Sequence, residues 1–449
     1  MTADRSARAS GLLPLAPKGL VLAPFRALRY AVPLSGLGTT NNAEPGLAEL
    51  TSPPYDVLTV DDVVALEKAS DHNVVRLILP RPAADGLDRY EHAARLLTQW
   101  RAAGVLQPDE APALYVYEQA DQVTGLAQRG LLGALALTPA EDGIVLPHEN
   151  TMAGPVADRL ALYTAVQADL EPIFLVYDGG GPASRAVAAA SDQPALVDVV
   201  LPDGLRHRLW SLTDPTLLAE IAADLAPRVA VIADGHHRYA TYLQRQRDHH
   251  QAGAGAGPWD AGLTFLVDAH AFGPQVHPIH RVIPGLEVYE LINRIGDGIR
   301  VHDLDGNDLD SALDALAEAG QSGPAFLLVS GDGGTIRLLE SPHPGRLAAA
   351  LPVERSAAWR ALDVVVLHTY LVTELWELAD TVETVGYEHD AAAAIATAAR
   401  TGGTAVLLNP TPVAAVTAVA GGGERMPRKS TLFTPKPRSG LLIRDHRDY

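Results

Sequence analysis

Short apolar runs alternate with segments of helical periodicity along most of the chain, and this alternation is the feature that most constrains the fold. The apolar runs are residues 74–79, 114–117, 131–137, 173–177, 229–233, 263–267, 326–330 and 405–409. Helical spacing is clearest in residues 87–103, 155–170, 215–225, 310–319 and 357–378. Strands that alternate with helices pack as sheets covered by helices. We therefore expect an α/β fold with mixed sheets.

Length and composition indicate a globular protein. With 449 residues, of which 47% are hydrophobic, the chain can bury one large core or two to three ordinary ones. Cuts near Asp109 and Pro284 would divide it into an N-terminal α/β segment (1–109), a core (110–284) and a C-terminal α/β segment (285–449). The flanking segments would then build the walls of a substrate site.

Charge and cysteine content exclude several classes of protein. The formal net charge of −19 argues against a sequence-independent nucleic-acid or membrane surface, because both need clustered positive charge. The absence of cysteine excludes disulfides and thiol catalysis. No apolar run reaches the length of a membrane span. We expect a cytoplasmic protein that binds neither nucleic acid nor a membrane; its oligomeric state is left open.

The apolar run 229–233 leads into Asp234-Gly235-His236-His237-Arg238, and a helix is expected to follow. At a helix N-terminus the free N–H groups and the helix dipole favour an anion, and glycine lets the backbone approach it closely. The two histidines and the arginine add donors suited to phosphate. Asp234 would repel a phosphate unless it serves a metal or a proton, so it is a candidate for chemistry.

Two other interpretations of this turn remain open. Adjacent histidines also occur in zinc sites, although such sites favour histidines four positions apart or cysteine pairs. The turn can also be purely structural, since a motif alone does not establish a function.

A second candidate segment is Pro147-His148-Glu149-Asn150-Thr151, which should form a loop before the helical segment 155–170. A single glutamate in a loop is usually solvated. Placed next to a reacting hydroxyl, however, Glu149 could act as a general base.

The two motifs together resemble those of the free serine kinases with a ParB/sulfiredoxin-like fold, which carry a P-H-E loop and a strand running into D-G-H-H-R. Nearly the whole chain also resembles the bacterial family called domain of unknown function 1015. That resemblance is carried by Pro24-Phe25-Arg26, Pro53-Pro54-Tyr55-Asp56-Val57, His148 to Thr151, Glu171-Pro172, Asp234 to Arg238, Pro278-Ile279-His280-Arg281, Leu362-Asp363-Val364 with His368, and Met426-Pro427-Arg428-Lys429-Ser430-Thr431.

The resemblance implies a ParB/sulfiredoxin-like core with flanking α/β segments, and it implies catalytic roles for Glu149 and Asp234. It also implies that Gly235, His236, His237 and Arg238 hold phosphate. The interval of 85 positions between Glu149 and Asp234 is longer than in the compact kinases and implies an insertion. Phosphoryl transfer to an alcohol needs a base, cations on the phosphoryl group and usually Mg²⁺. We expect Mg²⁺ with ATP or ADP as donor, or pyrophosphate; the metal ligands are left open.

The ordinary nucleotide-binding loops are absent from the sequence. No G-x-x-x-x-G-K-[ST] motif occurs, and no G-x-G-x-x-G opens a helix. Gly179-Gly180-Gly181 is followed by no lysine and is interpreted as a plain loop.

Lysine usage gives an independent indication. Of 35 basic residues only Lys18, Lys68, Lys429 and Lys436 are lysines, and the last two lie in the basic segment 425–438. Lysine is a compact, mobile charge suited to a terminal phosphate. We expect Lys429, Ser430 and Thr431 to contact phosphate where this segment folds over the site. The alternative is a flexible basic tail.

Further residues are candidates for holding the substrate. Tyr55 and Asp56 could contact an amino-acid ammonium or form a structural turn. His280 and Arg281 could bind phosphate or carboxylate, or be solvated ion-pair partners. His148 adjoins Glu149, and Arg159 could reach a substrate carboxylate; these are the other two candidates. His368 lies in an apolar helix and is interpreted as a satisfied core histidine.

These observations favour a small-molecule kinase that phosphorylates the hydroxyl of free L-serine or a similar metabolite. The main alternative is a nucleotide-binding regulatory switch without metabolite kinase activity, which would need no base at Glu149. A DNA-associated ParB relative is a third interpretation, and the negative charge disfavours it.

Overall fold

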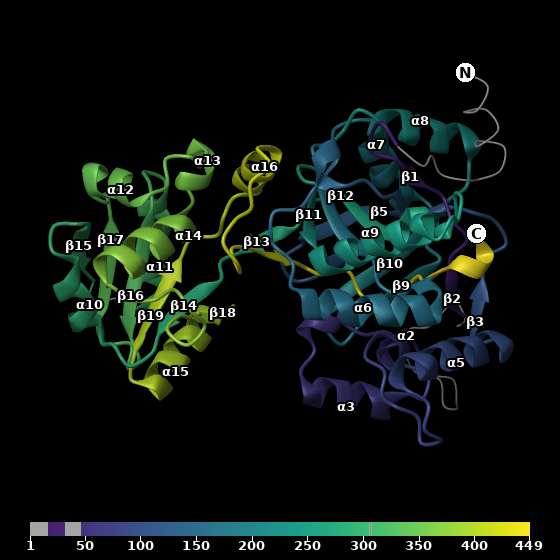
Figure 1. The fold of residues 1–449 in the computed structure, drawn as a ribbon, viewed down its shortest axis with the longest axis horizontal. Helices are drawn as coiled ribbons and strands as arrows, with labels where there is room; N and C mark the ends of the chain where they lie inside the picture. Colours follow the sequence, from purple (N-terminus) through teal and green to yellow (C-terminus); the bar gives the residue numbers. More distant parts are fainter. Residues whose placement is uncertain (1–16, 32–45, 305, 307) are drawn as a thin grey trace. The chain divides into compact units, whose positions relative to one another are not determined.

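The computed structural model describes residues 17–31, 46–304, 306 and 308–449, which divide into two compact units (Figure 1). Unit 1 comprises Met1–Pro274 and Pro435–Tyr449, and unit 2 comprises Gln275–Thr434. A separate cluster of buried apolar side chains lies in each unit.

Unit 1 is built on a mixed sheet that has nine strands in the described part of the chain, in the order β6-β11-β8-β12-β5-β4-β10-β9, with β1 beside β5. Its strands are β1 (Leu22–Ala23), β4 (Leu114–Asp121), β5 (Ala127–Ala136), β6 (Val145–Leu146), β8 (Ile173–Tyr177), β9 (Val197–Val200), β10 (Leu205–Leu212), β11 (Ala230–Asp234) and β12 (Ala261–Asp268). Every residue of β8 is buried, which explains its uninterrupted apolar sequence. β9 alternates between half-buried and exposed residues, as a strand at the sheet edge does.

Helices of unit 1 pack on this sheet and on one another, with α6 against α5 and α9, and α7 against α8 (Figure 1). Their bounds are α2 (Leu47–Leu50), α3 (Val60–Ala69), α4 (Val75–Ile78), α5 (Arg89–Ala102), α6 (Ala153–Val166), α7 (Pro182–Ala189), α8 (Pro215–Leu225) and α9 (His236–Gln251). Short 3₁₀ turns cover Tyr55–Val57, Ala140–Asp142, Ala190–Asp192, Pro258–Asp260 and His446–Asp448.

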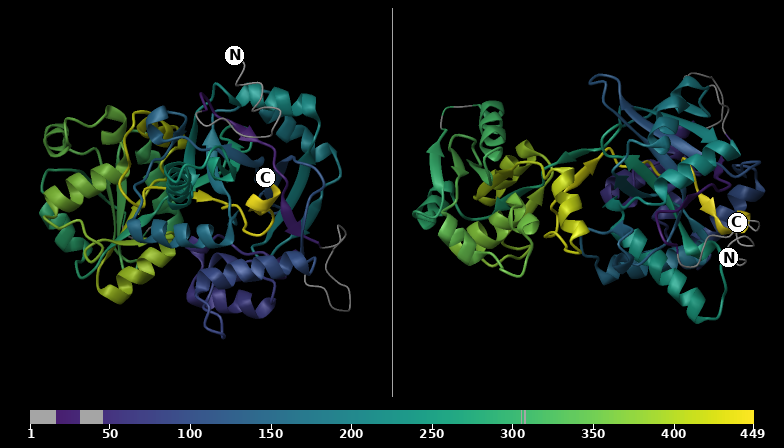
Figure 2. Two further views of the ribbon diagram at one scale, coloured as in Figure 1. Left: turned by 45° about the vertical axis from the view of Figure 1, so that its right-hand side comes forward. Right: turned by 90° about the horizontal axis from the view of Figure 1, so that it is seen from above.

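The C-terminal residues of the chain return to unit 1, and we call Pro435–Tyr449 the C-terminal strap. Its strand β21 (Arg444–Asp445) pairs with β7 (Ala168–Asp169), and single bridges join Ser439 to Ser52 and Ile443 to Leu28. A further two-stranded sheet of unit 1 pairs β2 (Leu28–Tyr30) with β3 (Leu106–Pro108). In Figure 2 the yellow strap runs among the elements of unit 1.

Unit 2 contains an antiparallel sheet in the order β15-β17-β16-β19-β14-β18. Its strands are β14 (His280–Ile283), β15 (Arg300–Asp303), β16 (Ala325–Ser330), β17 (Ile336–Glu340), β18 (Gly386–Glu388) and β19 (Thr404–Leu408). Its helices are α10 (Val288–Ile295), α11 (Leu309–Gly320), α12 (Pro344–Ala350), α13 (Ala357–Arg360), α14 (Asp363–Val365), a π-helix (Val366–Leu375), α15 (Ala391–Thr401) and α16 (Val413–Gly421).

The chain enters and leaves unit 2 through a two-stranded ribbon. Strand β13 (Gln275–His277) pairs antiparallel with β20 (Leu432–Thr434), so that Gln275 stands opposite Thr434 and His277 opposite Leu432. Unit 2 is therefore an insertion in unit 1 whose two ends lie side by side.

The expected α/β architecture is confirmed, and the large sheet of unit 1 is mixed as expected, whereas the sheet of unit 2 is antiparallel. Apart from 74–79, each expected apolar run overlaps a strand, and the run 173–177 coincides with β8. Helix α8 covers the expected residues. Its Asp214 accepts a hydrogen bond from Leu217 N at 2.8 Å, and Pro215 is its first residue.

The strand expected at residues 74–79 is wrong, because residues Val75–Ile78 form the single helical turn α4. Its apolar side chains are buried on all sides, and in that situation periodicity does not distinguish a strand from a helix. The buried side chain of Asn73 sets the turn, since its Oδ1 accepts from Val75 N at 2.8 Å and its Nδ2 donates to Glu49 O at 2.7 Å.

The helix expected at 155–170 begins at Ala153 and ends early, at Val166. Gln167 takes a left-handed conformation with φ of 53°, and the next two residues form strand β7. The partner of β7 is β21 at the far end of the chain, and local periodicity contains no information about such a pairing.

The continuous helix expected at 357–378 is interrupted. It divides into α13, α14 and the π-helix, which ends with Trp376 N donating to Leu371 O at 2.8 Å, five residues back. The apolar residues are buried as expected, but the wider turn changes which of them face the same side.

The compact units do not coincide with the three expected segments. Most of residues 1–284 falls in unit 1. At the expected cut near Asp109, Arg29 and Tyr115 both bind the Asp109 carboxylate, and β1 joins the same sheet as β5. The chain passes between the units at Pro274 and again at Thr434.

Candidate active site

The motif Asp234 to Arg238 lies where β11 meets α9, at the helix N-terminus that the sequence predicts. Gly235 precedes the helix with φ of 94°, in the left-handed region that favours glycine. A Cβ atom at this position would lie 3.2 Å from Arg238 Nε. The pairing register of β11 shifts between Ile232 and Asp234, as at a β-bulge, and such a shift re-aims the following side chain.

Both carboxylate oxygens of Asp234 bind cations. Arg238 Nη2 donates to Oδ2 at 2.5 Å, and Lys436 Nζ lies 2.6 Å from Oδ1. Charge-assisted bonds of this kind are short and strong. Asp234 is therefore placed to hold two cations in position.

Arg238 lies inside the protein, with 1% of its surface exposed. Its Nη1 donates to Pro172 O at 2.6 Å. Burial opposes the charge, but Asp234, Glu171 and Asp56 outweigh it and raise the pKa of the guanidinium. The sequence suggested the guanidinium of Arg238 as a donor to phosphate, but in the structure it donates to Pro172 O and to Asp234.

The two histidines of the motif brace the loop that carries Glu149. His236 Nε2 accepts from the backbone N of His148 at 3.3 Å, and His237 Nε2 accepts from Met152 N at 3.0 Å. Since a backbone N–H only donates, each Nε2 is an unprotonated acceptor in these bonds. The histidines therefore position the loop in this structure.

Glu149 is half-buried, and it lies in the loop between the two backbone N–H groups that these histidines bind, those of His148 and Met152. Its neighbour His148 is 1% exposed and shares a 2.7 Å hydrogen bond between its Nδ1 and the carbonyl of Ile232, a residue of β11. The rings of His148 and His236 meet edge to face with centroids 4.5 Å apart. The loop that carries Glu149 is thus bound to β11 and to the first turn of α9, the two elements between which Asp234 lies.

Residues Tyr55 and Asp56 belong to the same cluster. Asp56 Oδ2 accepts from Lys436 Nζ at 2.6 Å. Burial opposes the charge of Asp56, but Lys436 and Arg238 outweigh it and lower the pKa of the carboxyl. The Tyr55 ring faces the guanidinium of Arg159 at 4.4 Å and that of Arg238 at 5.9 Å.

Arg159, a candidate for a substrate carboxylate, is 2% exposed and is engaged by the protein itself. Its Nη1 donates to Ile78 O at 2.6 Å, and its Nε and Nη2 donate to Asp158. It supports the ring of Tyr55 and the neighbouring helix.

Two residues of the cluster were not among the candidates. Glu171 is fully buried; its Oε1 accepts from Tyr55 N and from Ser439 Oγ, both at 3.0 Å. Burial raises its pKa, against the opposing effect of Arg238 and Arg159. Lys436 bridges Asp56 and Asp234. The signals were present, since Glu171 lies in one of the family motifs and Lys436 is one of only four lysines.

The remaining candidates gather in unit 2. Arg281 is fully buried and donates from Nε to His368 Nε2 at 3.0 Å and from Nη2 to Lys429 O at 3.0 Å. The motif around Arg281, the motif around Lys429 and His368 are therefore in direct contact. His368 Nδ1 lies 3.0 Å from Asp380 Oδ1, so the interpretation of a satisfied, buried histidine fits its contacts.

Within this second cluster the candidates differ in access. Lys429 is exposed and has a left-handed backbone with φ of 56°. Ser430 is buried, its hydroxyl donating to Pro427 O, and Thr431 is half-buried. His280 Nδ1 accepts from Leu408 N at 3.2 Å, and burial lowers its pKa to about 4.

The structure thus sorts the candidates into two groups. Tyr55, Asp56, His148, Glu149, Arg159 and Asp234 to Arg238 lie in unit 1, whereas His280, Arg281, Lys429, Ser430 and Thr431 lie in unit 2.

Gly179–Gly181 forms a loop before α7, as the sequence indicates. Gly180 N donates to Asp268 Oδ2 at 3.1 Å. A phosphate in this loop would meet that carboxylate, so the loop is not suited to an anion.

Over the described residues, no group of three or more histidine, aspartate or glutamate side chains is arranged to hold a metal ion. Mg²⁺ brought by a nucleotide needs only one or two carboxylates beside the phosphates. Asp56 and Asp234 are the two aspartates of this cluster, and each already binds Lys436 Nζ. In the same part of the chain, no helix is both long and apolar enough to cross a membrane.

Residues 22–365 match the family described as "Protein of unknown function (DUF1015)", and the chain belongs to this family. Among solved structures, a free serine kinase mutant in complex with ADP is 12% identical, and the match covers 68% of this chain and 90% of that chain with a TM-score of 0.32.

Two further solved structures are similarly distant. A conserved hypothetical protein from Pyrococcus furiosus is 14% identical over 68% of this chain and 94% of that chain, with a TM-score of 0.31. SbnI with a C-terminal truncation from Staphylococcus aureus is 11% identical over 70% of this chain and 87% of that chain, with a TM-score of 0.33. No curated protein matches the chain.

Proposed function

We propose that the protein is a phosphotransferase that moves a phosphoryl group to the hydroxyl of a small metabolite, with free L-serine as the first choice and O-phosphoserine as product. One observation carries the proposal. The loop with Glu149 and the turn with Asp234 are far apart in sequence, yet His236 and His237 join them by hydrogen bonds at 3.3 and 3.0 Å. A candidate base and a candidate phosphate turn are thereby held in one site.

In the proposed reaction the acceptor oxygen forms a bond to phosphorus while the bond from phosphorus to the leaving phosphate oxygen breaks. The hydroxyl proton passes to the carboxylate of Glu149, and the bonding electrons leave with the departing phosphate group. ATP or ADP is the proposed donor, with pyrophosphate as the other choice. Mg²⁺, when bound with the donor, would neutralise phosphate charge, and its protein ligands are left open.

Asp234 has a different role from Glu149 in this proposal. Because its two oxygens bind Arg238 and Lys436, it orients cations and does not carry the transferred proton. Removing one partner of such a buried arrangement leaves an uncompensated charge, so Asp234 also secures the local fold.

The finer fold assignment is part of the same proposal. The P-H-E loop and the D-G-H-H-R turn both lie in unit 1, and on this basis we propose that the core of unit 1 is related to the ParB/sulfiredoxin-like fold. In unit 2 we propose an anion contact at the exposed Lys429, with Ser430, Thr431, His280 and the buried Arg281 supporting it. The cellular location we propose is the cytoplasm.

The decisive experiment is ³¹P NMR of the protein with Mg²⁺, each of ATP, ADP and pyrophosphate in turn, and a pool of hydroxy amino acids. We expect a phosphomonoester resonance that depends on an acceptor. If the protein binds a nucleotide yet forms no phosphoester with any acceptor, the regulatory switch is the better assignment.

A further inference from the structure

The ammonium of Lys436 lies between two carboxylates that come from distant parts of the sequence. Its Nζ is 2.6 Å from Asp56 Oδ2 and 2.6 Å from Asp234 Oδ1. The side chain is 14% exposed, so it is neither a surface lysine nor fully enclosed. Two of the three N–H donors of an ammonium are directed at these carboxylates, which leaves a third for another acceptor.

The backbone that carries Lys436 is held at several points. Gln119 Nε2 donates to Lys436 O and Gln128 Nε2 to Pro435 O, each at 2.9 Å. Further along the strap, Ser439 N donates to Ser52 O at 2.9 Å. The position of the Lys436 side chain is therefore set by the fold of unit 1.

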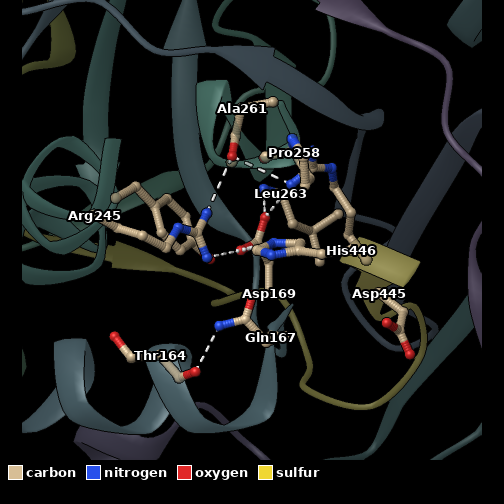
Figure 3. A network of polar contacts seen from close by, with 12 residues as sticks. Thr164, Gln167, Asp169, Arg245, Pro258, Ala261, Leu263, Asp445 and His446 are labelled. Atoms are coloured by element: carbon tan, nitrogen blue, oxygen red, sulfur yellow. Dashed lines mark hydrogen bonds and ion pairs between the residues drawn. The ribbon is translucent and has the colours of Figure 1, made fainter. Parts of the chain in front are cut away.

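The far end of the C-terminal strap is anchored on a buried carboxylate, Asp169 (Figure 3). Arg245 Nη1 lies 2.9 Å from Oδ1, Arg444 Nη1 lies 2.8 Å from Oδ2, and His446 Nε2 lies 3.2 Å from Oδ1. Burial opposes the charge of Asp169, but Arg245, His446 and Arg444 outweigh it and lower its pKa. The strap is thus held at Pro435 and Lys436 by hydrogen bonds of its backbone, and at Arg444 and His446 by contacts with Asp169.

Electrostatics keep Lys436 charged. Burial opposes the ammonium, but Asp234 and Asp56 outweigh it and raise the pKa of Lys436. The guanidinium of Arg238, by contrast, is fully buried and bound to Pro172 O as well as to Asp234. Of the two cations on Asp234, only Lys436 combines partial exposure with a flexible stem and a spare donor.

We propose that Lys436 is the residue that contacts the phosphoryl oxygens of a ligand bound at the Asp234 turn, with Asp56 and Asp234 as its positioning residues. The ligand class is a pyrophosphate-containing donor, and in this respect the inference rests on the proposed function. Lys436, in unit 1, would then fill the role that the sequence suggested for Lys429, which lies in unit 2.

Inorganic pyrophosphate binding, followed by calorimetry, tests the contact without any acceptor. Lys436→Met should weaken binding about 10–100-fold, the range for loss of a hydrogen bond between charged groups. The matched control is Lys68→Met, since Lys68 is an exposed lysine at the last turn of α3 in the same unit. That control should bind as the wild type does.

A second variant separates direct contact from charge balance. Two negative and two positive charges meet in the group formed by Asp56, Asp234, Arg238 and Lys436. Lys436→Met leaves this group with one excess negative charge. The double variant Asp56→Asn with Lys436→Met restores neutrality without the ammonium. If Lys436 contacts the ligand, the double variant stays weak. Recovery of wild-type binding in the double variant would show that only charge balance mattered and would overturn the proposal.

Folding and function are separated by two further measurements. Circular dichroism and thermal unfolding show whether each variant folds. If Lys436→Met is destabilised, a Lys436→Ala protein is titrated with ethylammonium. Direct contact predicts that the amine restores part of the pyrophosphate affinity, and failure of this rescue in a folded protein counts against it.

The outcomes for the kinase proposal differ from these. A wild-type protein that binds pyrophosphate through Lys436 but phosphorylates no hydroxyl contradicts the kinase proposal alone. A wild-type protein that phosphorylates serine while Lys436→Met does so equally well contradicts the role of Lys436 alone. A wild-type protein that does not bind pyrophosphate at all also overturns the role of Lys436.

Discussion

Glu149 and Asp234 lie in the same unit, yet their surroundings suit them to different tasks. Asp234 has a cation on each oxygen, whereas Glu149 is half-buried in a loop that two histidines brace. A group that must accept a proton needs access to the acceptor, and a group that orients cations needs strong bonds. At the scale of single residues, the proposed base is therefore Glu149.

Replacing Glu149 by glutamine tests this assignment. The amide keeps the shape of the side chain but cannot accept the hydroxyl proton, so turnover should fall by roughly 10²–10⁴-fold while donor binding persists. Steady-state kinetics and donor calorimetry measure the two effects. Glu141→Gln, in the exposed 3₁₀ turn Ala140–Asp142, is the control and should behave as the wild type does. Wild-type turnover in Glu149→Gln would exclude the catalytic role.

A second residue-scale prediction concerns Asp363 in unit 2. Burial raises the pKa of its carboxyl to about 7 from an ordinary value of 3.8. Between these values the folded state binds a proton that the unfolded state lacks, so stability falls as pH rises from about 3.8 to about 7 and does not change further above that.

Asp363→Asn should therefore stabilise the protein at pH 8 by about 2–4 kcal/mol and leave it nearly unchanged at pH 4. Urea unfolding of both proteins at the two pH values measures the difference. An equal effect of the substitution at pH 4 and pH 8 would mean that the carboxyl does not titrate in this range.

At the scale of elements, the first turn of α9 holds neighbouring segments of unit 1 in place. Its side chains were expected to donate to phosphate. Instead, His236 and His237 accept hydrogen bonds from the Glu149 loop, and Arg238 donates to Pro172 O. The backbone N–H groups at the start of α9 still lie where the helix dipole favours an anion.

His237→Ala removes the acceptor for Met152 N and should loosen the Glu149 loop. We expect kcat to fall about tenfold with little change in the Kd of the donor, because a misplaced base affects the chemical step more than binding. His249→Ala, in the last turn of the same helix, is the matched control. If the donor affinity falls in His237→Ala while kcat is retained, His237 contacts the ligand and is not a brace.

The C-terminal strap is the second element on which the site depends. Arg444→Met takes one cation from the fully buried Asp169, and breaking a buried pair in this way costs about 3–5 kcal/mol. Chemical denaturation should show this loss for Arg444→Met. The control Arg447→Met removes a side chain that is 42% exposed and should cost far less. Equal losses would show that the anchor at Asp169 is not the origin of the effect.

At the scale of the whole molecule, unit 2 is an insertion with adjoining ends. Gln275 pairs with Thr434 and His277 with Leu432, so the ribbon β13–β20 could be closed as a hairpin. Each unit also has its own cluster of buried apolar residues. A separate core is what a segment needs to fold by itself.

A chain in which Asn-Gly joins His277 to Leu432 should therefore retain the fold of unit 1, because this dipeptide favours the turn of a two-residue hairpin. Circular dichroism and a cooperative thermal transition check the fold. The shortened protein should also keep the contribution of Lys436 to pyrophosphate binding, since its partners all lie in unit 1. Loss of cooperative unfolding would show that unit 1 needs residues 278–431.

The sequence by itself determined those features whose cause is local. Apolar runs such as 173–177 predicted buried strands, Asp214 and Pro215 predicted the start of α8, and the residues around Gly235 predicted a strand-to-helix turn. Each depends on side chains within a few residues, where periodicity, capping and backbone preference act. The motif resemblance likewise predicted the family.

Only the tertiary structure decided what depends on contacts between distant segments. It made residues 75–78 a helical turn, ended α6 at Val166, and divided the candidate residues between two units. It also placed Lys436 beside Asp234, although the two residues are 202 positions apart in the sequence. The physical reason is the same in each case: a buried charge needs a partner and a strand needs a neighbour, and the chain supplies both from positions that local sequence does not specify.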